Sequence, residues 1–241
     1  MKRGFLFCYY AYFYRAAVTF GIESANVVGY QNVSVNESGF TLVSPTFKNV
    51  SGLQLTLANI GGNLQAMESV QLWDANGGTA EEYFYLDAAN SFTGEAGWFA
   101  DDFMTSANDK DIADGSSVAF QSQGSAELIF SGEVGREMTT IISLDAGFTA
   151  VGNNTPTDLT LSDIVFEGIS AMDSIQFVDA DGATEAEYFY LDAANSFTGE
   201  AGWFADDFMT SANDATISAG KGVLFQAANG ASVTIKIPAA L

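Results

Sequence analysis

One stretch of this chain occurs twice, and this internal identity constrains the fold more than any other feature. Residues 82–109 read EYFYLDAANSFTGEAGWFADDFMTSAND, and residues 187–214 repeat them letter for letter, 105 positions later. Weaker similarity continues upstream, where residues 66–72 match residues 171–177. A unit of about 105 residues therefore organises the 241-residue chain, which is long enough for two copies that each bury a core.

The periodicity inside each unit predicts strands. Leu53, Leu55 and Leu57 alternate with polar residues, and short Val, Ile, Phe and Tyr runs are separated by Gly, Asn, Asp and Ser clusters. We expect about eight short strands per unit at spacings typical of sandwiches and barrels. Residues 205–212 are the one stretch that fits a turn of helix. The predicted fold class is all-β, with two tandem β-sandwich domains of about 105 residues and a closed β-barrel as the alternative.

Three segments follow from the repeat. Residues 1–21 resemble a signal peptide, because Lys2 and Arg3 precede a short apolar, aromatic run. Residues 22–133 form the first repeat and residues 134–241 the second. No Pro-rich or Ser-rich linker separates the repeats, so we expect them to abut. One large domain made of two half-units is the alternative.

The composition limits the function. The chain has 30 acidic and 8 basic residues and a net charge of −22, which disfavours nucleic acid and anionic membranes as partners. It contains no histidine, the commonest general base, and its single cysteine, Cys8, lies in the leader-like segment. We therefore expect a secreted or cell-surface protein that is not an enzyme and has no membrane span once the leader is removed.

Several motifs resemble those of exported β-rich tandem-repeat proteins of bacteria, in which a signal peptide runs into a VVGY-type first strand. The motifs are the opening NVVGY at residues 26–30, GFTLV at residues 39–43, and AGKGVLF at residues 219–225 before a final Thr/Ile strand. The resemblance implies secretion and an all-β fold. It carries no catalytic or ligand-binding residue over to this chain.

The identical blocks also suggest a sugar platform. Exposed aromatic rings can stack on a sugar while neighbouring carboxylates bind its hydroxyls, but the same rings can equally fill a core. A duplicated carbohydrate-binding site would use a set of aromatic and acidic residues: Tyr83, Tyr85, Trp98, Asp101 and Asp102 in one copy, and Tyr188, Tyr190, Trp203, Asp206 and Asp207 in the other.

The acidic residues allow two further interpretations. Ca²⁺ prefers oxygen ligands such as carboxylates. The candidate calcium ligands are Asp87, Glu95, Asp179, Asp181, Asp192 and Glu200. The alternative for Asp179 and Asp181 is a hairpin turn in which Asp-Gly supplies positive φ. Residues 74–78 are expected to form the corresponding hairpin connection in the first repeat. A glycoside hydrolase built on Asp101 and Asp102 is a remote hypothesis, because residues 97–103 are expected to form a strand and neighbours on a strand point to opposite faces.

The sequence thus favours a non-catalytic extracellular structural or adhesive protein. Its expected partners are polysaccharides or cell-surface components, and self-assembly by strand addition at sheet edges is a further hypothesis. Carbohydrate binding at the duplicated aromatic and acidic loops is the main alternative.

Overall fold

The computed structural model describes residues 28–36, 38–47, 54–124, 127–133 and 139–236. The leader expected at residues 1–21 and residues 134–138, where the second repeat was expected to begin, lie outside the described residues.

The described residues of the first repeat form ten strands and one short 3-10 helix: β1 (Val28–Ser34), β2 (Gly39–Val43), β3 (Leu55–Thr56), η1 (Leu57–Asn59), β4 (Ile60–Gly62), β5 (Ser69–Trp73), β6 (Thr79–Leu86), β7 (Gly97–Phe99), β8 (Asp111–Ile112), β9 (Val118–Ser122) and β10 (Glu127–Glu133). The second repeat follows the same order: β11 (Thr139–Leu144), β12 (Gly147–Gly152), β13 (Leu159–Thr160), η2 (Leu161–Asp163), β14 (Ile164–Glu167), β15 (Ser174–Val178), β16 (Thr184–Leu191), β17 (Gly202–Phe204), β18 (Thr216–Ile217), β19 (Gly222–Ala227) and β20 (Ala231–Lys236). The prediction of an all-β chain is confirmed.

In the described part of the chain, each repeat builds three antiparallel sheets of its own. In the first repeat the strand orders are β2-β9-β5-β6-β7, β1-β10-β4 and β3-β8, and the second repeat reproduces all three. None of these sheets closes on itself within the described residues, so the closed-barrel alternative is wrong. Because every named sheet stays within one repeat, the repeat seen in the sequence is also the unit of strand pairing.

The core of each repeat lies between its larger sheets. In the first repeat Val70 and Phe120 of the five-stranded sheet meet Leu128 and Phe130 of the three-stranded sheet in one cluster, and all four are almost fully buried. The second repeat buries a corresponding cluster around Ile175, Phe225 and Val233. Burial of these large apolar side chains is the main force that holds the sheets face to face.

The two repeats are joined by a contact with approximate two-fold symmetry. The Phe40 amide donates to the Ala180 carbonyl at 2.7 Å, and the corresponding Phe148 amide donates to the Ala75 carbonyl at 2.8 Å. At the other end of the same strands, the Ser44 amide donates to the Gly220 carbonyl at 2.9 Å, and the Gly152 amide donates to the Gly115 carbonyl at 2.8 Å. Each bond thus recurs with the roles of the repeats exchanged, as in the isologous interface of a dimer.

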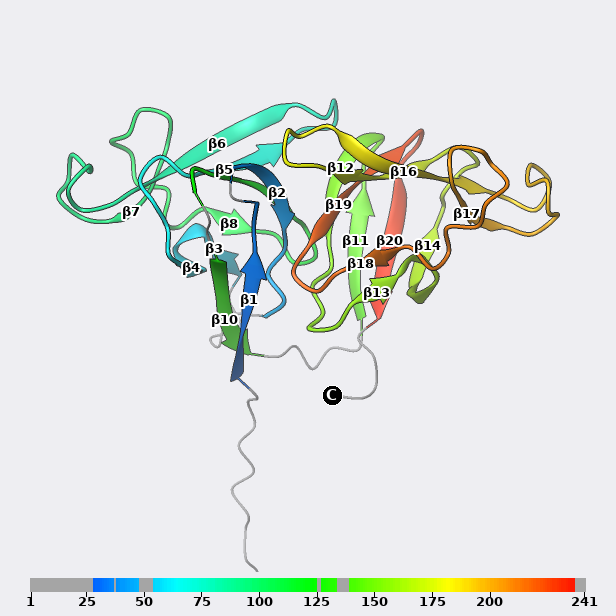
Figure 1. Ribbon diagram of the computed structural model, residues 1–241, viewed down its shortest axis with the longest axis horizontal. Helices are drawn as coiled ribbons and strands as arrows, with labels where there is room; N and C mark the ends of the chain where they lie inside the picture. The colour runs from blue at the N-terminus through cyan, green and yellow to red at the C-terminus, as the bar shows by residue number, and fades with distance from the viewer. Residues whose placement is uncertain (1–27, 37, 48–53, 125–126, 134–138, 237–241) are drawn as a thin grey trace, which may run out of the picture.

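A small apolar cluster is buried at this contact between the repeats. Leu42, Ala119 and Leu224 are buried together, with Phe40 and Phe148 packed against them from the two repeats. The prediction that the repeats abut agrees with this shared cluster. Figure 1 shows the consequence for the molecule, with β2 and β12 near its middle and β7 and β17 toward opposite ends of its longest axis.

Some sequence expectations about elements were wrong. β4 and β8 were not expected, and the strand expected over residues 97–103 ends at Phe99. The turn of helix expected at residues 205–212 is a tight backbone turn, closed by the bond from the Ala205 amide to the Thr210 carbonyl at 2.9 Å. The described part of the chain holds no helix long and apolar enough to cross a membrane.

Candidate functional site

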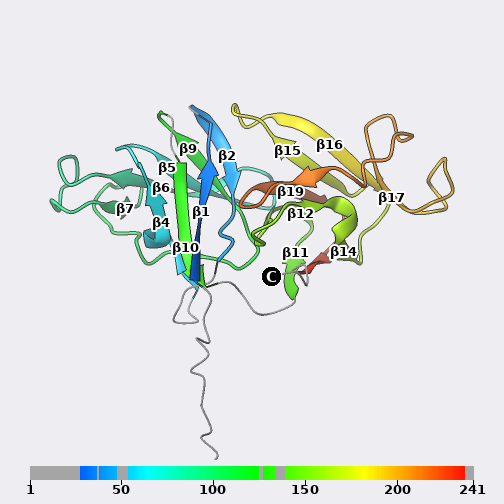
Figure 2. The ribbon, with the colours of Figure 1, turned by 60° about the horizontal axis from the view of Figure 1, so that its bottom comes forward.

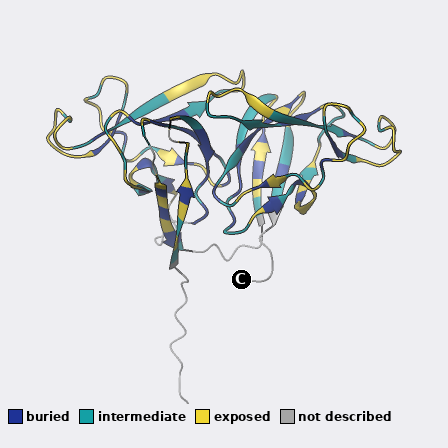
Figure 3. Ribbon diagram, in the orientation of Figure 1, coloured by how far each residue is buried: buried dark blue, intermediate teal, exposed yellow. Residues whose placement is uncertain are grey.

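The identical blocks form two loops at each end of the molecule. In the first repeat, residues 87–96 connect β6 to β7 and residues 100–106 follow β7; in the second, residues 192–201 and 205–211 take the same places. Both loop pairs also lie at the outer ends of the molecule in the second orientation of Figure 2. Figure 3 shows that they are largely exposed. We call these loop pairs the first tip and the second tip.

The longer loop of each tip is ordered by an aspartate at its start. Asp87 Oδ1 accepts bonds from the Ala89 amide at 3.0 Å, from the Asn90 amide at 2.8 Å and from Asn90 Nδ2 at 2.8 Å. This closed turn leaves the Phe92 side chain 78% exposed. Phe197 in the second tip is also 78% exposed, so both tips present an aromatic ring to solvent.

The shorter loop is held by a second aspartate. Asp102 Oδ1 accepts the amides of Met104 at 2.8 Å and Thr105 at 2.7 Å, while Oδ2 accepts the Thr105 hydroxyl at 2.6 Å. These bonds, led by the one from the Thr105 hydroxyl, hold the pKa of Asp102 below its ordinary value. The turn leaves the Met104 side chain 67% exposed. In the second tip Asp207 accepts the corresponding amides, and the Met209 side chain is 66% exposed.

The aromatic side chain at the centre of the predicted sugar platform is buried. Trp98 is 1% exposed and Trp203 is 3% exposed, and both belong to the cores of their repeats. A ring without an accessible face cannot stack on a sugar, so the prediction of a platform on Trp98 and Trp203 was wrong. The alternative, that these rings fill the core, is correct.

The tyrosines of the platform are also engaged in packing. Tyr85 meets Trp98 edge-on with ring centroids 5.6 Å apart, and Tyr190 meets Trp203 in the same way at 5.7 Å. The Tyr83 hydroxyl donates to Glu81 at 2.7 Å, and the Lys110 ammonium lies 5.6 Å from the centre of the Tyr83 ring. Tyr188 packs edge-on against Phe177, with ring centroids 5.7 Å apart. The four tyrosines therefore support the sheets rather than form an open stacking surface.

The acid pairs lie in turns and not on strands. Asp101 and Asp102 follow β7 within the tight turn, and Asp206 and Asp207 follow β17 in the same way. The expectation that Asp101 and Asp102 alternate across a strand was therefore wrong. Since Asp102 uses both carboxylate oxygens within its own turn, the geometry gives no support to its role in a glycosidase pair.

Three of the six candidate calcium ligands, Asp87, Asp179 and Asp192, use their carboxylates to accept backbone amides of their own turns. Asp179 Oδ1 accepts the amides of Asp181 and Ala183, both at 2.9 Å, and Gly182 has φ of +78°, so the hairpin-turn alternative is confirmed. Asp192 repeats the turn made by Asp87, and Glu95 and Glu200 lie on the exposed loops. Among the residues that the structure describes, no three carboxylates, histidines or cysteines are grouped so as to hold a metal ion.

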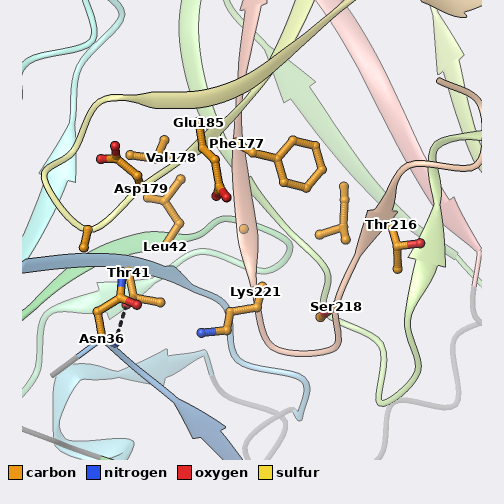
Figure 4. Close-up of a pocket in the computed structure, with 13 residues that line it drawn as sticks. Asn36, Thr41, Leu42, Phe177, Val178, Asp179, Glu185, Thr216, Ser218 and Lys221 are labelled. Carbon is orange, nitrogen blue, oxygen red and sulfur yellow. Dashed lines mark hydrogen bonds between the residues drawn. The ribbon is translucent and has the colours of Figure 1, made fainter. Parts of the chain in front are cut away.

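The sequence did not reveal a pocket at the junction of the repeats. The pocket has a volume of about 380 Å³, and its walls come from both halves of the chain, with Thr41 and Leu42 on one side and Phe177 and Val178 on the other. In Figure 4 the Glu185 carboxylate and the Lys221 side chain lie on opposite sides of this space. No local pattern signals such a site, because its walls are more than a hundred residues apart in sequence.

Comparison with known proteins assigns no family: no protein-family model, no curated protein and no solved structure matches this chain. The resemblance to exported bacterial β-rich proteins therefore stays a prediction.

Proposed function

We propose that this chain is a non-catalytic extracellular structural protein that assembles end to end through its two tips. The proposal includes the expected organisation as two tandem sandwich domains, fused here by the two-fold contact into one elongated subunit. The observation that carries it is the repetition of one exposed loop pair at both ends, with Phe92 and Phe197 equally exposed.

A second copy of the chain is the partner that this arrangement favours. Two identical surfaces can pair isologously, so one tip surface is enough to make a contact between molecules. Because each molecule carries that surface twice at opposite ends, every contact leaves a free tip, and pairing continues into a linear chain. Exposed aromatic and methionine side chains such as Phe92 and Met104 are the kind enriched where proteins meet.

The acidic charge of the tips determines how assembly should depend on salt concentration. Glu95 and Asp101 are exposed in the first tip, and Glu200 and Asp206 are exposed in the second, so tips that meet bring like charges together. Salt screens such repulsion over roughly 8 Å at physiological ionic strength. We therefore expect assembly to strengthen as salt is raised, which is opposite to contacts held by ion pairs.

Sedimentation velocity over a concentration series in 150 and 500 mM NaCl tests this function. The expected result is a ladder of species that grows with concentration and further with salt. A single monomeric species at every concentration and at both salt levels contradicts the proposal.

A further inference from the structure

The pocket at the junction of the repeats is a place where the two-fold symmetry of the molecule breaks. The contacts around it obey the symmetry: Val43 bridges to Lys221 in one direction, and Val151 bridges to Ser116 in the other. Position 221 of the second repeat therefore corresponds to position 116 of the first, and a lysine stands where the other side has a serine.

Two further departures from the repeat fall in the same pocket. Val178 corresponds to Trp73, since each ends the strand that pairs with the long hairpin strand and each follows the same register shift. Glu185 corresponds to Ala80, which follows Thr79 just as Glu185 follows Thr184. One side thus combines a smaller side chain with an added cation and an added carboxylate, whereas the symmetric side has Trp73, Ser116 and Ala80.

The two charges do not neutralise each other. The Lys221 ammonium donates to the Ser34 carbonyl, and the structure describes no hydrogen bond or ion pair that joins Glu185 to another residue. Burial lowers the pKa of Lys221, so its charged form lacks the solvation that water would give. Each group therefore has capacity for an external partner of opposite charge.

We propose that this pocket binds a small zwitterion, with its carboxylate on Lys221 and its ammonium on Glu185. Leu42, Phe177 and Val178 supply an apolar lining for the short carbon chain between the two charged groups. A volume of about 380 Å³ accommodates an amino acid, at the lower end of the roughly 300–1,000 Å³ seen for small-molecule sites. The net charge of −22 disfavours an anion as the ligand, and a zwitterion adds no net charge.

The test is isothermal titration calorimetry of the full chain with amino acids whose charged groups are progressively farther apart: glycine, β-alanine, γ-aminobutyrate and ε-aminocaproate. Glucose and N-acetylglucosamine serve as uncharged comparisons. The expected result is saturable binding that peaks at one chain length and is absent for both sugars. Binding of a sugar without any zwitterion, or no heat from any probe, overturns the proposal.

Three variants that borrow the residue of the other repeat locate the site. Val178→Trp refills the pocket, whereas Lys221→Ser and Glu185→Ala each remove one charge. We expect at least tenfold weaker binding in each, with an unchanged far-ultraviolet circular dichroism spectrum. Ser116→Lys on the symmetric side is the matched control and leaves the affinity unchanged.

Undiminished binding in the two charge variants assigns the ligand elsewhere and overturns the proposal, even if Val178→Trp fails to fold. End-to-end assembly is tested separately, because none of these residues lies on a tip.

Discussion

At the residue scale, the two tryptophans show how the same motif supports opposite hypotheses. Gly97–Phe99 and Gly202–Phe204 each place a tryptophan beside acidic turn residues, a pattern that suits a sugar platform. In the structure each indole points into the core. The exposed side chains nearby are a phenylalanine and a methionine in each repeat, which no sequence pattern had marked: Phe92 and Met104, and Phe197 and Met209. Composition could not decide between these outcomes, because the direction of a ring depends on which face of the sheet becomes covered.

Replacing Trp98 by alanine tests that burial. The substitution removes a large side chain from the core and leaves a cavity, so we expect a loss of about 3–5 kcal/mol in the free energy of unfolding. Urea denaturation followed by circular dichroism measures it. Phe92→Ala is the control, with an expected change within about 0.5 kcal/mol because the ring is exposed. A change below about 1 kcal/mol for Trp98→Ala contradicts the core assignment.

The short tip loops should respond to acid. Hydrogen bonds from Thr105 and Met104 favour the charged form of Asp102 and lower its pKa, and the same holds for Asp207. A lowered pKa means that the stabilisation is present above the ordinary aspartate pKa, about 3.9, and is lost as pH falls through the folded-state value. Carboxyl NMR titration should give midpoints below the ordinary value for both residues. Midpoints at or above it contradict the turn geometry.

At the element scale, regular strands were predictable and very short ones were not. β5 and β6 flank the Asp74–Gly78 connection, where the Asp74 carboxylate accepts the Asn76 amide at 2.8 Å, and that hairpin was expected from its sequence. β8 has two residues and β4 begins directly after η1, so neither spans enough residues to show an alternating pattern. Their pairing comes from distant partners, as when Ile112 faces Leu55.

The edge of β2 gives the sharpest prediction about the contact between repeats. Gly39 has φ of +89°, and a Cβ there would lie 1.9 Å from the Ala180 carbonyl oxygen. Gly39→Ala therefore combines backbone strain with a clash against backbone, and we expect it to separate unfolding of the two repeats into distinct transitions. Chemical denaturation followed by fluorescence and circular dichroism measures this.

Gly94 provides the matched control for that substitution. Its φ of +75° is similarly positive, but nothing lies within 4 Å of the added Cβ. Gly94→Ala should cost roughly 1–2 kcal/mol from the left-handed backbone alone and preserve a single transition. Equal effects of the two substitutions show that the close approach at Gly39 does not hold the repeats together.

At the scale of the whole molecule, the identity of the two blocks predicts the repeat but not the two-fold arrangement of the repeats. The paired bonds of Phe40 and Phe148 reveal that the repeats meet as two partners of a dimer would, which places their identical blocks at opposite ends. The pocket with Lys221 and Glu185 also belongs to this scale, because neither repeat forms it alone. Such features depend on long-range packing and leave no local pattern.

If the two identical tips are the points of assembly, blocking them one at a time must shorten the assemblies in a defined way. Phe92→Ser with Met104→Ser disables the first tip, and the corresponding Phe197→Ser and Met209→Ser changes disable the second. By sedimentation velocity in 500 mM NaCl at one matched protein concentration, we expect chains for the unaltered protein, nothing larger than dimers for either one-tip variant, and monomers when both tips are altered. Chains of unaltered length in a one-tip variant, or any assembly when both tips are altered, would contradict the account.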